Sequence, residues 1–433
     1  MTIAPTISSL TFFFPYYEVS GVPVLFSRLA QYLADEKKIP CYIVDYTEGY
    51  MGRTMQFHEG LKLIEFRDGE PFNIPENTIL VMQSIVPYTM RPELKIPPTT
   101  RLFFWNLHPN NLVPTLVPFG SFFRNLQDNT SWFYDFAVST FARSTLKEMQ
   151  KFVKMCLLKK GLAFMDQPNL EKTIQRLRLN IAPTFLPLPA AENTEGSSIA
   201  DRWSTISENA LVEQLATEMR FAWVGRLCDF KSYILMYTMQ RISEYAAVNQ
   251  YKIRFYVVGS GEFEQEIKNL PIQHAYFEAI FISRIDADKL GQFFLNQVDV
   301  LVAMGTSALD GAAYGLPVLR LDFTYQPIKQ DYRYQWLYES INYDVAHEIT
   351  KNDFEPNNQS LEDKIKDLRI NYKTISNKTL VYFNQHHALK SVVDIFLATV
   401  DETTLTYNNI DPIILKKGLL RRMRDVKLYK TFN

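Results

Sequence analysis

The chain has 433 residues, a formal net charge of −1 at pH 7 and 47% hydrophobic residues. The length predicts two domains, and this hydrophobic content is enough to bury two cores. The nearly neutral charge excludes bulk nucleic-acid binding, which needs a basic excess.

Cysteine usage and the absence of apolar runs indicate the compartment. The three cysteines, Cys41, Cys156 and Cys228, are scattered and lack metal-ligand spacing, which predicts a reducing environment and no disulfide framework. The first residues lack the pattern of a signal peptide. No apolar run approaches the roughly 20 residues of a membrane span. We therefore expect a cytoplasmic protein.

The first half opens as a strand, helix and strand. Apolar runs at 9–15 and 41–45 predict buried strands, and a helical pattern lies between them at 24–33. Gly21 precedes that helix, where a backbone without a side chain lets a ligand approach closely. A glycine needed only for packing explains the pattern equally well. Further strands are predicted at 61–66 and 78–82.

A histidine ends the next predicted strand, at 101–107. His108 stands before Pro109, and the residue before a proline is pushed out of helical conformation, so we expect His108 on a loop at the strand end. A lone histidine is usually structural, but a strand end favours a functional role. Another strand is predicted at 136–140, and a small, polar stretch places the domain boundary within 190–217.

Two cations flank a strand-to-helix loop in the second half. A strand is predicted at 220–227 and a long helix at 233–247. Arg226 and Lys231 flank the loop that joins them. Arginine can bind a diphosphate through two parallel hydrogen bonds, and lysine binds it as a single point charge. The alternative is two solvated surface cations.

The next two predicted strands also end in polar sequence. The strand at 252–258 runs into Gly259-Ser260-Gly261, and the strand at 279–284 ends at Arg284. We predict that Arg284 also contacts the bound ligand. Asp286 and Asp288 form a DxD pattern, which many metal-dependent sugar transferases use. Because this pattern directly precedes a helix, capping and dipole pairing are favoured over metal binding, and no metal is predicted.

The stretch 304–318 is the centre of the prediction. A buried strand at 298–303 precedes Gly305, and a helix is expected to start near Thr306. The free N–H groups at such a helix start form an anion-binding site, and the hydroxyls of Thr306 and Ser307 add hydrogen-bond donors. Asp310 could accept hydrogen bonds from a sugar diol. Alternatively, Ser307 and Asp310 form only a capping box.

Two later features, the aromatic segment and the basic tail, have structural explanations beside functional ones. The aromatic segment 321–338 either lines a sugar or acceptor pocket or packs in the core, and the segment 351–400 is charged and helical. The basic amphipathic tail at 416–430 either lies on an anionic membrane surface or is the solvated face of a terminal helix.

Taken together, these motifs resemble the retaining glycosyltransferases of the two-Rossmann (GT-B) type, near family 4, which includes capsule and O-antigen enzymes. The matching positions, in chain order, are Gly21, His108, Gly225-Arg226 with Lys231, Gly259 and Gly261, and Gly305 to Val318. The resemblance implies that His108 lies beside the donor sugar, that Arg226 and Lys231 grip the donor diphosphate, and that Asp310 binds ribose. The family acid is usually Glu where this chain has Asp310, and a second family Glu corresponds here to Val302.

The resemblance implies two Rossmann-like α/β domains facing a central cleft. We expect an acceptor-binding domain at 1–200, joined by C-terminal helices at about 395–433, and a donor-binding domain at 215–394. The implied reaction is retaining, metal-independent transfer of a sugar from a nucleotide-sugar donor to a saccharide or lipid-linked acceptor in surface polysaccharide biosynthesis. Two alternatives stay open: a nucleotide-sugar epimerase of the same fold, and a non-catalytic binding or scaffold subunit.

Overall fold

The fold is described from a computed structural model. The residues described are 7–18, 20–84, 90–109, 111–112, 143–190, 215, 217–329, 331–349 and 358–415. The strand predicted at 136–140, most of the expected linker and the basic tail at 416–430 lie outside these residues.

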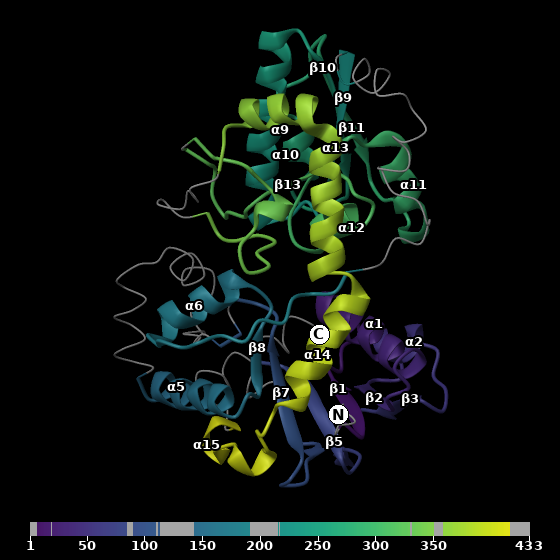
Figure 1. The fold of residues 1–433 in the computed structure, drawn as a ribbon, viewed down its shortest axis with the longest axis vertical. Helices are drawn as coiled ribbons and strands as arrows, with labels where there is room; N and C mark the ends of the chain where they lie inside the picture. The colour runs from purple at the N-terminus through teal and green to yellow at the C-terminus, as the bar shows by residue number, and fades with distance from the viewer. Residues whose placement is uncertain are drawn as a thin grey trace. The chain divides into compact units, whose positions relative to one another are not determined.

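The chain forms two compact units. Unit 1 comprises 1–188 and 392–433, and unit 2 comprises 189–391. Each unit has a central sheet covered by helices (Figure 1). Within the described residues, no helix is both long enough and apolar enough to cross a membrane.

Unit 1 is built on a parallel sheet with strand order β3-β2-β1-β5-β7-β8. Its strands are β1 (Ser9–Phe13), β2 (Cys41–Asp45), β3 (Leu61–Glu65), β5 (Thr78–Gln83), β7 (Arg101–Asn106) and β8 (Leu162–Phe164). Its helices are α1 (Gly21–Asp35), α2 (Tyr50–Thr54), α5 (Arg143–Leu158) and α6 (Gln167–Leu177), and the short strands β4 (Phe72–Asn73) and β6 (Leu94–Lys95) pair with each other. The four strands predicted before residue 90 are all present.

The end of the chain completes the core of unit 1. Helix α14 (Leu389–Asp401) places Phe396 against Phe12, Phe103 and Trp105, with ring centroids 6.0 to 6.3 Å apart. The short 3₁₀ helix η2 (Tyr407–Asn409) and helix α15 (Pro412–Leu415) follow. The expectation that C-terminal helices pack back on the first domain is therefore confirmed.

Unit 2 is built on a second sheet, with strand order β11-β10-β9-β12-β13-β14. The parallel strands are β9 (Glu218–Val224), β10 (Lys252–Val258), β11 (Phe277–Ile282), β12 (Val300–Ala303) and β13 (Val318–Arg320), and β14 (Gln335–Trp336) runs antiparallel to β13. The helices are α9 (Asp229–Asn249), α10 (Glu264–Lys268), α11 (Ala287–Gln297), α12 (Thr306–Ala312), α13 (Leu361–His386) and the 3₁₀ helix η1 (Leu337–Glu339).

The aromatic segment after β13 belongs mainly to the core of unit 2. Tyr332, Tyr334 and Trp336 expose 5%, 1% and 1% of their surface. Core packing, one of the two sequence interpretations, is thus confirmed for these three residues, whereas Tyr325 is exposed.

Candidate functional site

The carboxyl ends of strands β9 and β12 define the candidate site. Strand β9 has β10 on one side and β12 on the other, so the chain direction across the sheet reverses between β9 and β12. Phe221 pairs with Val300 and Ala222 with Leu301, so the two strands run parallel and in step. Ligands of open α/β sheets bind at such a topological switch point, outside the carboxyl ends of the strands.

Two cations follow β9 at this switch point. Arg226 is exposed, and Lys231 is half-buried at the start of α9. Desolvation, followed by the positive charge of Arg226, lowers the pKa of Lys231, although Cys228 acts in the opposite direction. No carboxylate in the described part of the chain forms an ion pair with either cation. A partly desolvated ammonium without an acidic partner favours a bound anion.

The glycines after β10 fit this loop closely. A side-chain carbon on Gly259 would lie 2.0 Å from the carbonyl oxygen of Gly225, and one on Gly261 would lie 2.3 Å from that of Leu227. The Leu227 N–H donates to the Ser260 carbonyl at 3.1 Å, which joins the two loops. Both glycines therefore have a packing reason, and their contact with a donor stays a prediction.

The turn after β12 starts a helix where the sequence predicts one. Gly305 has φ of +63°, which glycine adopts without strain, and α12 begins at Thr306. The predicted capping box is wrong, because Gly305 is the N-cap and no side chain caps this helix. The first N–H groups of α12 have no intrahelical acceptor, as in any helix. Thr306 is exposed, and Ser307 and Asp310 are half-buried.

Arg284 and the DxD pattern lie at the edge of the sheet. Strand β11 is separated from β9 by β10, and the Arg284 side chain is 83% exposed, with its Nε 3.4 Å from Asp286. Asp286 occupies the N-cap position of α11 without a side-chain cap bond, and Asp288 lies in the first turn. This arrangement favours a local structural role for all three residues, and donor binding by Arg284 stays a prediction.

The predicted residues of unit 1 lie at a helix start and at a strand end. Gly21 is the first residue of α1, and a side-chain carbon added there would meet no atom within 4 Å. His108 follows β7 on a turn, where its carbonyl accepts from the Asn111 N–H at 3.0 Å. The residue is exposed, and desolvation, followed by the charge of Lys172, lowers the pKa of its imidazole, which favours the neutral form.

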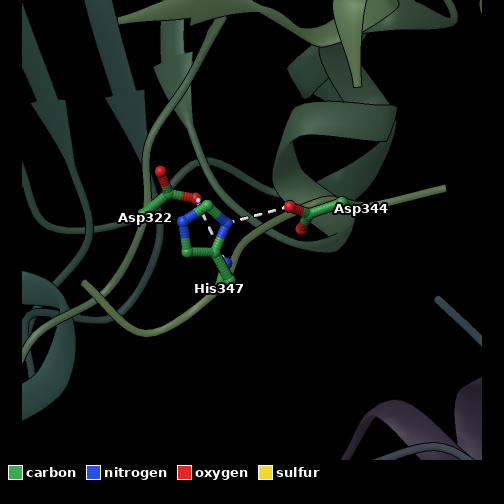
Figure 2. Close-up of side chains that lie close together, drawn as sticks. All are labelled: Asp322, Asp344 and His347. Atoms are coloured by element: carbon green, nitrogen blue, oxygen red, sulfur yellow. Dashed lines mark hydrogen bonds and ion pairs between the residues drawn. The ribbon is translucent and has the colours of Figure 1, made fainter. Parts of the chain in front are cut away.

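Sequence reasoning missed a cluster of charged residues at the end of strand β13 and in the segments that follow it. We call Arg320, Asp322, Asp344 and His347 the buried cluster; the first three are buried, and the His347 side chain is 17% exposed. The Arg320 guanidinium lies 3.2 Å from a carboxylate oxygen of Asp322 and 2.5 Å from one of Asp344. Figure 2 shows the His347 ring between the two carboxylates, and its Nδ1 lies 2.9 Å from Asp344 and 3.3 Å from Asp322. The one signal of this cluster in the sequence was an arginine, Arg320, inside the apolar run 318–323.

The cluster is electrically balanced when His347 carries a proton. Burial lowers the pKa of His347, but Asp322 and Asp344 outweigh burial and raise it to about 9. Burial likewise raises the pKa of Asp344, but Arg320 and His347 reverse that effect, so its net pKa is lowered. Two cations and two carboxylates therefore pair at neutral pH.

The cluster also has the geometry of a metal site. One ligand atom from each of Asp322, Asp344 and His347 lies within 4.8 Å of the others. However, Arg320 contacts both carboxylates, and a protonated imidazole is not a metal ligand. The donor set is therefore occupied by the protein's own cations and does not fit a metal ion.

Comparisons with known proteins support the fold. No protein-family pattern matches the sequence, and no curated protein matches it either. A glycosyltransferase from Rickettsia africae ESF-5 is structurally similar, with 12% identity, coverage of 95% of this chain and 100% of that one, and a TM-score of 0.51. A trehalose-6-phosphate protein from E. coli bound with UDP-2-fluoro glucose has 10% identity, coverage of 91% and 99%, and a TM-score of 0.51. A trehalose-6-phosphate synthase, OtsA, has 11% identity, the same coverage, and a TM-score of 0.50.

The chain has the GT-B fold. Each unit is one of the two Rossmann-like domains of that fold. Val302, which stands where the resembled family often has a second Glu, is fully buried within β12.

Proposed function

We propose that this chain is a glycosyltransferase that moves a sugar from a nucleotide-sugar donor to a saccharide or lipid-linked saccharide acceptor. The observation that carries the proposal is the pair Arg226 and Lys231, which stands without a carboxylate partner among the described residues at the switch point of unit 2. The GT-B fold supports it, because its structural neighbours include a glycosyltransferase and a protein bound with a UDP sugar.

The chemistry requires stabilisation of a leaving diphosphate. When the anomeric bond breaks, negative charge grows on the β-phosphate. Arg226 and Lys231 at fixed positions would stabilise that charge, and preorganised electrostatics of this kind usually make the largest contribution to such a step. These cations supply the charge that a metal would otherwise supply, so we propose metal-independent transfer.

The finer features of the reaction are part of the proposal. We assign Asp310 to the donor ribose, Thr306 and Ser307 to the diphosphate, and His108 to the sugar. A retaining course, with the acceptor hydroxyl attacking from the leaving-group face, follows from the family-4 resemblance of the motifs. The same resemblance suggests a role in surface polysaccharide biosynthesis.

Replacement of Lys231 tests the proposal. Lys231→Ala should lower the affinity for a nucleoside diphosphate at least tenfold, because a charged hydrogen bond contributes about 1.5–3 kcal/mol, and should abolish transfer. The measurements are calorimetric titration with UDP, GDP, ADP and dTDP, and turnover of the matching nucleotide sugars. Arg241→Ala is the matched control, since it removes a surface cation that pairs with Glu244 on the same helix. Equal affinity in Lys231→Ala and wild type would refute the assignment.

The same assays separate the alternatives. A nucleotide-sugar epimerase would change the donor without any acceptor, whereas a glycosyltransferase needs the acceptor for sustained turnover. A non-catalytic scaffold whose site has decayed would bind none of the four diphosphates.

A further inference from the structure

The buried cluster is joined to both sides of the proposed diphosphate site by backbone hydrogen bonds. On the β12 side, the Gly305 N–H donates to the Val345 carbonyl at 2.9 Å. On the β9 side, the Thr324 N–H donates to the carbonyl of Phe230, the neighbour of Lys231, at 3.0 Å. The segments 321–325 and 343–349, which carry three of the four cluster residues, thus contact the two loops that flank the switch point.

The cluster holds these two segments to each other. The His347 N–H donates to Asp322 Oδ1 at 3.1 Å, and the Phe323 N–H donates to the His347 carbonyl at 2.8 Å. The Ala346 N–H donates to Asp344 Oδ1 at 2.9 Å, which shapes the second segment around its own carboxylate. Arg320, fully buried at the end of β13, forms ion pairs with both carboxylates.

Aromatic packing supports the same connection. The Phe230 ring lies 5.8 Å from the Phe323 ring and 6.0 Å from the Tyr325 ring. The Lys231 ammonium lies 5.7 Å from the centre of the Phe230 ring. A displacement of 321–325 would therefore move Phe230 and, with it, the start of α9 that carries Lys231.

We propose that Arg320, Asp322, Asp344 and His347 are positioning residues, which hold the Gly305 turn and the start of α9 in place and so raise the affinity of this site for a nucleoside diphosphate. The inference rests on the proposed function for its ligand. Its positioning part concerns the chain alone and is measurable without a ligand.

Hydrogen exchange of the full-length protein tests the positioning. In His347→Gln and, as a second variant, Asp344→Asn, the Gly305 and Thr324 amides should lose protection, because the acceptor of the first, Val345, and the second amide itself lie on segments that the cluster holds. Arg220→Met is the matched control: it breaks the ion pair with buried Asp299, 2.6 Å long, at the opposite ends of β9 and β12. The control should spare Gly305 and Thr324. Unchanged protection at both amides in the cluster variants would overturn the inference.

Nucleotide binding tests the effect on affinity. We take the diphosphate, among UDP, GDP, ADP and dTDP, that wild type binds most tightly. It should bind His347→Gln about tenfold more weakly, an effect at the lower end of that known for residues that orient the ligands of metal sites, and Arg220→Met equally well. If wild type binds one of the four and His347→Gln binds it equally, this inference alone fails. If wild type binds none, the proposed function fails together with the affinity part.

The pH dependence of nucleotide affinity distinguishes an effect of the charge on His347 from an effect of the changed side-chain shape. The groups that face His347 are the carboxylates of Asp322 and Asp344 and the guanidinium of Arg320, with the Tyr332 hydroxyl bonded to Asp322. The ratio of the two Kd values, His347→Gln over wild type, should fall toward one as pH rises above about 9, because wild type then loses its imidazolium. Titration of Lys231 is common to both proteins and cancels in the ratio. A ratio that stays constant with pH would contradict a role for the charge.

Discussion

At the scale of single residues, the proton on His347 links stability to pH. Its folded pKa of about 9 lies above the ordinary value of 6.5, so the stabilisation is fully present below about pH 6.5 and is lost as pH rises through about 9. A difference of this size corresponds to about 3 kcal/mol. We expect the free energy of unfolding of wild type, relative to His347→Gln, to fall across this range in urea titrations. A difference that is the same at pH 6 and pH 10 would contradict the assigned proton.

Glycine substitutions separate packing from ligand contact. Gly259→Ala should destabilise the protein by roughly 1–3 kcal/mol, because φ is +145° and the new carbon would collide with the Gly225 carbonyl. Gly21→Ala has open space and should leave stability unchanged or raise it by up to about 1 kcal/mol. Thermal unfolding checks both. The open space around Gly21 leaves no packing reason for this glycine. If Gly21→Ala impairs transfer without loss of stability, the predicted close approach of a ligand is supported, whereas unchanged transfer would contradict it.

At the scale of elements, α14 is a structural part of unit 1. Phe396 is fully buried among the aromatic side chains of β1 and β7. Phe396→Ala should therefore lower the free energy of unfolding by about 3–5 kcal/mol, the usual loss for a buried phenylalanine. Lys390→Ala, an exposed position on the same helix, should change it by less than about 0.5 kcal/mol. Equal midpoints for the two variants in urea would show that α14 does not contribute to the core.

The elements that sequence reasoning missed share a physical cause. Strand β8 has three residues, and three residues are too few to show a period. Strands such as β2 were predicted because they are buried on both faces, so their apolar run is continuous. Arg320 appeared in the sequence only as a charge within an apolar run, and its partners Asp344 and His347 come more than twenty residues later.

At the scale of the whole molecule, the two units differ in how the chain builds them. Unit 2 is one continuous stretch, 189–391, whereas unit 1 needs the returning segment from 392. The Leu102 N–H on β7 donates to the Leu405 carbonyl at 2.8 Å, and Leu405 is fully buried. The core of unit 1 is therefore incomplete without the end of the chain.

Fragments test this difference. Residues 189–391 should fold alone, with a cooperative thermal transition by circular dichroism, and residues 1–188 should not. Addition of 392–433 through a flexible linker to 1–188 should restore a cooperative transition, because it returns Phe396 of α14 and the segment at Leu405 that hydrogen-bonds to β7. A cooperative transition in 1–188 alone would refute the dependence.

By itself, the sequence determined the alternation of strands and helices and the two-domain class. It also determined that Gly21, His108, Arg226, Lys231 and Gly305 lie after strands or in the first turns of helices, because hydrophobic period, glycine and proline act over a few residues. Only the tertiary structure decided that β9 and β12 are neighbours, that Gly259 and Gly261 pack on a facing backbone, and that Arg320, Asp322, Asp344 and His347 form one neutral cluster. These facts depend on contacts between residues far apart in the chain, and local pattern carries no information about which distant charge will meet which.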